Sequence, residues 1–236
     1  MKKLLVITGG TKGIGLAVIK QFASAGFDII TCSRSAERLA TLKKNLTNEF
    51  PGIEVQVKKT DLTNKNDTFE FISFVKSFKR IPDVLINNAG LFFPGSVTDE
   101  PEGNLELLMQ LNMYSAYHIT RGLIKDMIAR KSGHIFNICS TASITAYSNG
   151  GAYSISKFAL YGMTKVLREE MKPFNIRVTA ILPGATLTES WAGTDLPPER
   201  FMKPEDVATT IYQAWSLSAG SVVEDLIIRP QLGDIH

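Results

Sequence analysis

Short apolar runs alternate with longer amphipathic stretches almost from one end of this 236-residue chain to the other. The runs have the length of strands and are apolar on both faces, which is typical of parallel strands covered by helices on both sides. The alternation therefore predicts an α/β fold with a doubly wound, seven-stranded parallel sheet and right-handed crossovers. The strands are expected at 4–8, 28–33, 53–58, 84–87, 134–139, 177–182 and 225–229, and the helices near 14–25, 35–49, 64–79, 104–130, 152–172 and 204–218.

Several of these helices carry start signals. Asp61 and Thr63 precede the third, and Pro204 with Glu205 and Asp206 opens the last. Ligands of a doubly wound sheet gather at the carboxyl ends of its strands. The motifs described below lie at or just after such ends, so one shared site is expected there.

Bulk properties narrow the function classes. The length suits one buried core, so we expect a single domain over residues 1–236. The net charge of +3 is small and dispersed, which argues against a nucleic-acid partner. The apolar run at 4–7 is too short for a signal peptide or a membrane span, so no membrane partner is expected. Cys32 and Cys139 are predicted to be reduced, buried thiols of a cytoplasmic protein.

No metal site is predicted from the three histidines. His118 and His134 lack the spacing to acids or cysteines that metal ligands need, and His236 is the chain end.

A glycine-rich turn follows the first expected strand and opens the first helix. Its glycines are Gly9, Gly13 and Gly15, with Thr11, Lys12 and Ile14 between them. Glycines allow a tight turn and close approach of a ligand, and a helix N-terminus offers N–H groups to a phosphate. A purely structural strand-to-helix turn is the alternative, but the position favours a nucleotide.

The end of the second strand bears on which nucleotide is bound. A dinucleotide fold that reads the ribose 2′-hydroxyl usually has an acid there, whereas this chain has Ser33 and Arg34. Together with Lys12 they could hold a 2′-phosphate, although all could equally be solvated surface groups. We therefore expect NADP(H) rather than NAD(H).

Two further segments are expected beside the cofactor. Asp61 with Leu62 could contact the adenine, with helix capping as a compatible alternative role for Asp61. Asn88, Ala89 and Gly90, after the fourth strand, leave room for the cofactor, and they could also form a structural turn.

The candidate catalytic groups are Asn112, Ser140, Tyr153 and Lys157. Tyr153 and Lys157 lie one helical turn apart, on one face of a helix. A free phenol has a pKa of about 10, and a nearby cation is expected to lower that pKa toward neutrality. Each residue also has an ordinary structural interpretation, as a core tyrosine, a solvated lysine, a turn hydroxyl or a helix kink.

These motifs together resemble the short-chain dehydrogenase/reductase family, which has a Rossmann-type fold. The resemblance covers residues 3–229. It rests on Thr8-Gly9-x-x-x-Gly13-Ile14-Gly15, Asn87-Asn88-Ala89-Gly90, Asn112, Ser140, Tyr153-x-x-x-Lys157 and Pro183-Gly184-x-x-x-Thr188, all in order.

The resemblance implies a role for each of these positions. Tyr153 would donate a proton to a carbonyl, or accept one from an alcohol, and Lys157 would hold the nicotinamide ribose and lower the pKa of Tyr153. Ser140 would polarise the substrate, and Asn112 would hold a water. Cofactor contacts are also implied for Pro183, Gly184, Thr186 and Thr188. Family members associate through their fourth and fifth helices, which implies a homodimer or homotetramer, although the C-terminal segment departs from the common glycine-rich ending.

Residues 185–202, with Trp191, are expected to form a substrate lid. Phe92, Phe93 and Tyr147 could add apolar walls for a ketone or aldehyde, or for the matching alcohol, but the substrate is not specified by the sequence. The expected function is an NADP(H)-dependent oxidoreductase. The alternative is a catalytically silent dinucleotide-binding protein that acts as a redox sensor or scaffold.

Overall fold

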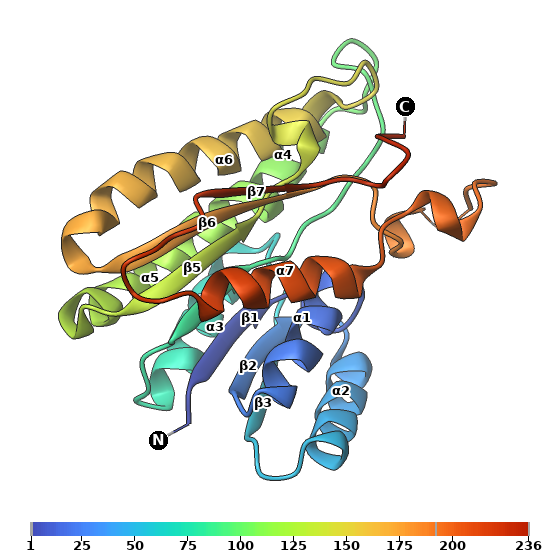
Figure 1. The fold of residues 1–236 in the computed structure, drawn as a ribbon. Helices are drawn as coiled ribbons and strands as arrows, with labels where there is room; N and C mark the ends of the chain where they lie inside the picture. Colours follow the sequence, from blue (N-terminus) through green and yellow to red (C-terminus); the bar gives the residue numbers. More distant parts are fainter. Residues whose placement is uncertain (1, 192, 236) are drawn as a thin grey trace.

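Seven parallel strands form one sheet in the computed structural model, which describes residues 2–191 and 193–235 (Figure 1). Their order across the sheet is β3-β2-β1-β4-β5-β6-β7, so the direction of winding reverses between β1 and β4. The predicted doubly wound α/β fold is confirmed. The strands are β1 (Leu4–Thr8), β2 (Asp28–Ser33), β3 (Val55–Lys59), β4 (Val84–Asn87), β5 (Gly133–Ile138), β6 (Ile176–Pro183) and β7 (Asp225–Ile228).

Helices cover both faces of this sheet. α1 and α7 pack against each other on one face, and α3 packs against α5 on the other (Figure 1). The helices are α1 (Gly13–Ser24), α2 (Ala36–Glu49), α3 (Lys65–Ser77), α4 (Asn104–Met109), α5 (Ser115–Arg130), α6 (Gly151–Met171) and α7 (Pro204–Ser216).

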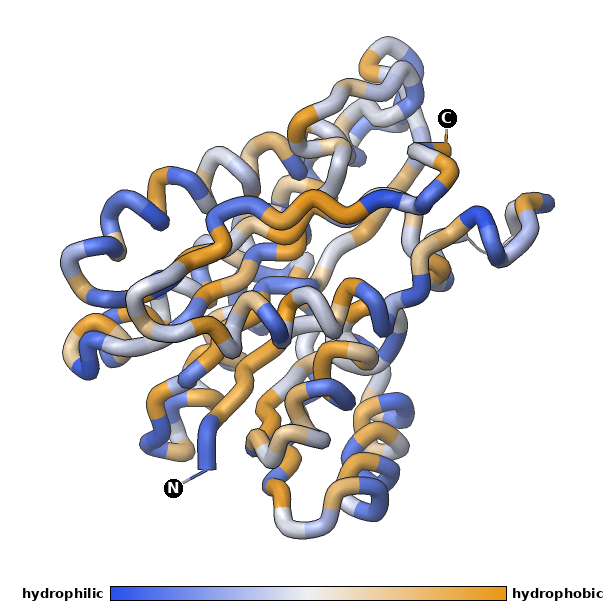
Figure 2. Tube along the Cα trace, in the orientation of Figure 1, coloured by the Kyte–Doolittle hydropathy of each residue, from blue (hydrophilic) through white to orange (hydrophobic). Residues whose placement is uncertain are grey.

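Successive residues of β1 point into two different cores. Leu5 and Ile7 pack with α1 and α7, whereas Leu4 and Val6 pack with α3 and α5. All are almost fully buried, and burial of each such side chain contributes about 1.5–3 kcal/mol. Figure 2 shows the consequence as apolar strands at the centre and polar positions along the outer helices.

One predicted helix differs from the structure in an informative way. The stretch 104–130 was expected to be continuous, but a π-helical turn at Gln110–Tyr114 separates α4 from α5. A π turn widens the helix locally and is common at functional sites. This turn carries Asn112, whose side chain is turned into the protein and is only 1% exposed.

Helix starts follow the sequence signals with one correction. Pro204 opens α7 as predicted. α3, however, is capped by Asn64, whose side chain accepts the N–H groups of Asn66 and Asp67 at 2.8 and 3.3 Å. Asp61 instead accepts from the backbone and hydroxyl of Thr63, so it shapes the preceding turn.

Both cysteines are buried, at 1% and 2% exposure. Burial raises the pKa of Cys32 to about 12 and that of Cys139 to about 11, because a thiolate is poorly solvated there. Within the described residues, no helix has the length and apolarity that crossing a bilayer requires.

Candidate active site

The carboxyl ends of the central strands open into one cavity of about 1280 Å³. Ser140 and every residue predicted to contact the cofactor line it, whereas Asn112 lies behind its wall. The predicted residues that share this cavity are Gly9, Thr11, Lys12, Gly13, Ile14, Gly15, Ser33, Arg34, Asp61, Leu62, Asn88, Ala89, Gly90, Tyr153, Lys157, Pro183, Gly184, Thr186 and Thr188.

The glycine-rich turn has the shape of a phosphate cradle. Gly9 has φ +70°, and a Cβ on Gly15 would lie 2.4 Å from the Gly9 carbonyl oxygen, so α1 begins directly against β1. Lys12 is the N-cap of α1 but provides no side-chain cap. The first N–H groups of α1 therefore remain available to an anion, which fits the phosphates of a dinucleotide.

Hydrogen bonds tie the ends of β1 and β4 together beside this turn. The Thr8 hydroxyl accepts the N–H groups of Asn88 and Ala89, both at 3.0 Å. The Asn88 amide donates to the carbonyls of Thr8 and Gly9 at 2.8 and 3.1 Å. The crevice at the point where the strand order reverses is thus rigidly framed.

Ser140 follows β5 and begins a short 3₁₀ turn at Thr141–Ser143. Its hydroxyl accepts the N–H of Ala142 at 3.1 Å, which fixes the side chain at the rim. The Ser140 side chain lies close enough to the Tyr153 hydroxyl to lower the pKa of that phenol. The Phe92 ring lies edge-on to that of Tyr153, with centroids 4.9 Å apart.

The electrostatics of Tyr153 differ from the expectation. Burial raises its pKa, and the nearby Ser140 side chain opposes this only in part. The Lys157 ammonium donates to the Ile138 carbonyl at 2.8 Å and lies 5.8 Å from the centre of the Tyr153 ring. Burial lowers the pKa of Lys157 to about 8. The phenol is therefore held in its protonated form.

Asn112 braces the wall behind Lys157. Its Oδ1 accepts the Leu91 N–H at 2.9 Å, and its Nδ2 donates to the Leu91 carbonyl at 3.0 Å and to the Ser156 hydroxyl at 2.9 Å. The π turn in which it lies is thereby fixed to the segment after β4 and to α6. Its implied role in holding a water stays a prediction.

Glu100 caps the helix that carries Tyr153. The Ala152 N–H lies 3.1 and 3.2 Å from its two carboxylate oxygens, at the start of α6. Gly151 has φ +24°, and a Cβ there would lie 2.5 Å from the Gly95 carbonyl oxygen. Sequence reasoning missed Glu100, because it lies 52 residues from its partner with no signal linking them.

A cluster of charges lies near the end of β2. Glu189 pairs with Lys12 and with Arg38, whose Nη1 is 3.0 Å from its Oε1. These contacts lower the pKa of Glu189, chiefly through the hydrogen bond from Lys12. Sequence reasoning missed Arg38, although it lies only four residues after Arg34 in the sequence. It also missed Glu189, the residue after Thr188.

The C-terminal segment contributes to the wall of the cavity. Asp234 lines the cavity and accepts from Arg229 at 2.9 Å and from the Tyr147 hydroxyl at 3.4 Å. Trp191 lines it as well and packs on Phe201 with ring centroids 5.0 Å apart. Trp191 and Tyr147 were predicted to lie at the site, but no local pattern indicates that the chain brings Asp234 back to the cavity.

The comparison with known proteins decides the family. The model of the short chain dehydrogenase family matches residues 3–197. The chain belongs to the short-chain dehydrogenase family. It is 32% identical to a sepiapterin reductase of Chlorobaculum tepidum, over 100% of this chain and 99% of the relative. Members of this family are oxidoreductases, so the chain is an enzyme of that class.

Two solved oxidoreductase structures share the fold of the whole chain. An L-sorbose reductase of Gluconobacter frateurii, complexed with NADPH and L-sorbose, superposes with a TM-score of 0.89 at 27% identity, over 97% of this chain and 95% of that one. An alcohol dehydrogenase of Thermococcus sibiricus has a TM-score of 0.92 at 24% identity, with both chains fully covered. The second likeness supports the fold alone.

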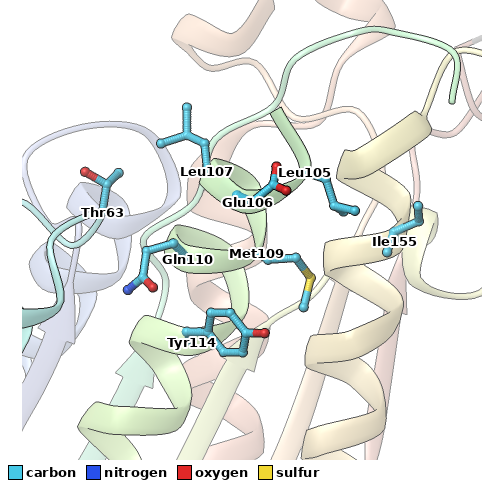
Figure 3. A pocket seen from close by; sticks show the side chains of 8 residues that line it. All are labelled: Thr63, Leu105, Glu106, Leu107, Met109, Gln110, Tyr114 and Ile155. Carbon is cyan, nitrogen blue, oxygen red and sulfur yellow. The ribbon is translucent and has the colours of Figure 1, made fainter. Parts of the chain in front are cut away.

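A second hollow, of about 620 Å³, lies on the outer side of α4 and α6 (Figure 3). Leu105, Met109 and Ile155 contribute apolar side chains to it, and Tyr114 lies below them. None of the predicted site residues lines this hollow. Thr63 lines both this hollow and the large cavity, so the two are neighbours in the structure.

Proposed function

We propose that this protein is an NADP(H)-dependent oxidoreductase that transfers a hydride between the nicotinamide and a carbonyl or alcohol substrate. The observation that carries the proposal is that Ser140, Tyr153 and Lys157 line one large cavity, with the buried Lys157 ammonium 5.8 Å from the centre of the Tyr153 ring. A proton donor and a polarising hydroxyl thus share one cavity with the glycine-rich phosphate cradle.

The nicotinamide, when bound, supplies or accepts the hydride. The Gly9–Gly15 turn would hold the phosphates, and Asn88 with Pro183 and Gly184 would line the dinucleotide. Ser140 would hydrogen-bond the substrate oxygen, and Tyr153 would pass its phenolic proton to that oxygen during reduction. Because burial keeps the phenol protonated, Tyr153 is ready to act as an acid near neutral pH.

Lys157 would support Tyr153 in two ways. Its ammonium, charged below a pKa of about 8, favours electron density on the phenolic oxygen as the proton leaves. It would also turn from the Ile138 carbonyl to hold the nicotinamide ribose. The resemblance assigns that contact, and the burial of Lys157 beside the cavity supports it.

Two independent findings support NADP(H) over NAD(H). Lys12, Arg34 and Arg38 all line the cavity near the end of β2, with no carboxylate on that strand end. Relatives of known structure were solved with NADP or NADPH. Steady-state kinetics with both cofactors would test this, and a preference for NAD(H) would contradict it.

The substrate class is a ketone or aldehyde with apolar bulk, or the matching alcohol. Phe92, Tyr147 and Trp191 line the substrate end of the cavity and supply apolar surface. The decisive test is the loss of NADPH absorbance over a panel of carbonyl compounds that includes sepiapterin and L-sorbose, which are named for two relatives. No turnover of any substrate, with tight NADPH binding retained, would favour the silent sensor or scaffold instead.

We further propose that residues 1–236 form one domain, with 185–202 as the substrate lid, and that the protein is a cytoplasmic homodimer or homotetramer. The outer surfaces of α4, the π turn and α6 expose Leu105, Tyr114, Ile155, Phe158 and Val166, each at least 39% exposed. Apolar surface of this kind supports self-association through these helices. Light scattering would give the stoichiometry.

A further inference from the structure

One carboxylate stands among the cations that line the cofactor end of the cavity. Glu189, in the short turn Glu189–Trp191, pairs with the Lys12 ammonium and the Arg38 guanidinium. The three groups come from the glycine-rich turn, from α2 and from the segment after β6. Their side chains are 52–53% exposed, so solvent and ligands reach them.

This cluster lies where a dinucleotide fold binds the adenosine ribose of its cofactor. Arg38 lies in the first turn of α2, and its N–H donates to the Ser35 hydroxyl at 3.2 Å. Ser33 and Arg34 immediately precede that cap and line the same cavity. In a doubly wound dinucleotide fold, the end of β2 is where the 2′ position of the adenosine ribose is read.

A carboxylate and a phosphate monoester seek the same donors there. The monoester carries about −1.5 to −2 charges and three acceptor oxygens, against one charge and two oxygens for Glu189. An arginine fork can pair with either group. The two anions also repel each other, so one pair of cations cannot serve both equally well.

We propose that Glu189 is an internal competitor of the cofactor's 2′-phosphate for Lys12 and Arg38, and thus a residue that determines cofactor specificity. This inference rests on the proposed use of a nicotinamide dinucleotide. When NADP(H) binds, its 2′-phosphate displaces the Glu189 carboxylate from both cations. When NAD(H) binds, the Glu189 carboxylate stays paired with both cations. Only NADP(H) has to displace it, so Glu189 reduces the ratio of NADP(H) affinity to NAD(H) affinity.

The test is the substitution Glu189→Gln, with dissociation constants for NADP and NAD measured by titration calorimetry at low ionic strength. The glutamine keeps the size of the side chain and removes its charge. We expect NADP to bind about fivefold to tenfold more tightly, the size expected from two exposed ion pairs. The NAD dissociation constant should change by less than twofold.

Glu199→Gln is the matched control. It removes the same charge from the same segment, but Glu199 is exposed and does not line the cavity. Both dissociation constants should stay within twofold of wild type in this control. If Glu189→Gln leaves NADP affinity unchanged, or tightens NADP and NAD equally, Glu189 is not a competitor of the 2′-phosphate.

The Arg38→Gln variant tests whether Arg38 is one of the cations for which Glu189 and the 2′-phosphate compete. The Arg38→Gln variant should bind NADP more weakly than the wild-type protein does. Adding Glu189→Gln to this variant should increase NADP affinity by at most half as much as it does in the wild-type protein, because the two residues share one interaction. A full gain in that background would exclude Arg38 from the competition. A wild-type protein that binds neither dinucleotide would instead refute the proposed function, which separates the two failures.

Discussion

The two walls of the cavity are held together by different kinds of interaction. The wall built from β1, β4, the π turn and α6 depends on buried and partly buried hydrogen bonds, such as those of Asn112 and Asn88. The opposite wall, built from residues 185–202 and the C-terminal segment, depends on ion pairs that reach solvent, among them Glu189 with Arg38 and Arg229 with Asp234.

Because of this difference, the first wall holds one fixed arrangement of side chains, whereas the side chains of the second wall can change their partners. Buried hydrogen bonds leave unpaired groups when broken, so they hold one arrangement. Exposed ion pairs contribute little and exchange readily with water and ligands. The proposed proton-transfer groups therefore lie on the rigid wall, and the groups that would adapt to cofactor and substrate lie on the other.

The largest expected effect is on the rigid wall. Tyr153→Phe removes the proposed proton donor, so kcat for carbonyl reduction should fall by about 10²–10⁴-fold with little change in NADPH affinity. Tyr161→Phe, on the same helix but bonded to Asp225, is the control and should keep kcat near wild type. Full turnover by Tyr153→Phe would remove this tyrosine from the mechanism.

The pH dependence of reduction should report on Lys157. Its pKa is lowered to about 8, so the ammonium is charged below that pH and loses its proton above it. The reductive rate should be full below pH 8 and fall about tenfold per unit well above it. Lys157→Met should be slow at every pH without this alkaline limb, and an unchanged limb in that variant would assign it to another group.

The lowered pKa of Lys157 also makes the stability of the protein depend on pH. The unfolded chain keeps the lysine proton up to its ordinary pKa of 10.5, whereas the folded chain releases it near 8. The unfolded state therefore binds more protons between these values, and the contribution of Lys157 to stability rises with pH across that window.

Disrupting the brace of the rigid wall should cost stability. Asn112→Ala leaves the Leu91 N–H and carbonyl without their partner, whereas the Ser156 hydroxyl keeps its bond to the Tyr153 carbonyl. We expect the free energy of unfolding to drop by about 2–4 kcal/mol in urea titrations, because buried unpaired groups cost about 1–3 kcal/mol each. Asn45→Ala, at an exposed position of α2, is the control and should change it far less.

The smallest effect is expected on the adjustable wall. Arg229→Gln breaks the ion pair with Asp234, a pair whose arginine is 38% exposed. The free energy of unfolding should change by less than about 1 kcal/mol in the same urea titration. A loss as large as that of Asn112→Ala would mean that the two walls do not differ in the way described.

The fold was accessible from sequence because its signals are local. The apolar runs of β1 and β4 lie at the predicted residues, and Pro204 marks the start of α7. The π turn around Asn112 was not predictable in the same way. Its neighbours keep a helical apolar pattern, and the extra residue is accommodated by contacts with Leu91 and Ser156, far away in the sequence.

Some residues of the candidate site could likewise be predicted from sequence and others could not. Residues next to strand ends, such as Ser140 and the glycine-rich turn, could be placed because the topology brings strand ends together. Glu100 and Asp234 could not, because they reach the site from loops whose path no local pattern specifies. The expected lowering of the Tyr153 pKa was wrong chiefly because the phenol is buried, and burial could not be inferred from the spacing of Tyr153 and Lys157 along a helix. That spacing also did not indicate that the Lys157 ammonium donates to the Ile138 carbonyl.

The burial of Cys32 and Cys139 affects how the protein can be handled. With ionisation held off until strongly alkaline pH, neither sulfur presents a nucleophile to alkylating agents or peroxides in ordinary buffers. Storage in air without dithiothreitol should therefore leave both thiols of the folded protein unmodified, and any slow loss of turnover on the bench would have to originate elsewhere in the chain.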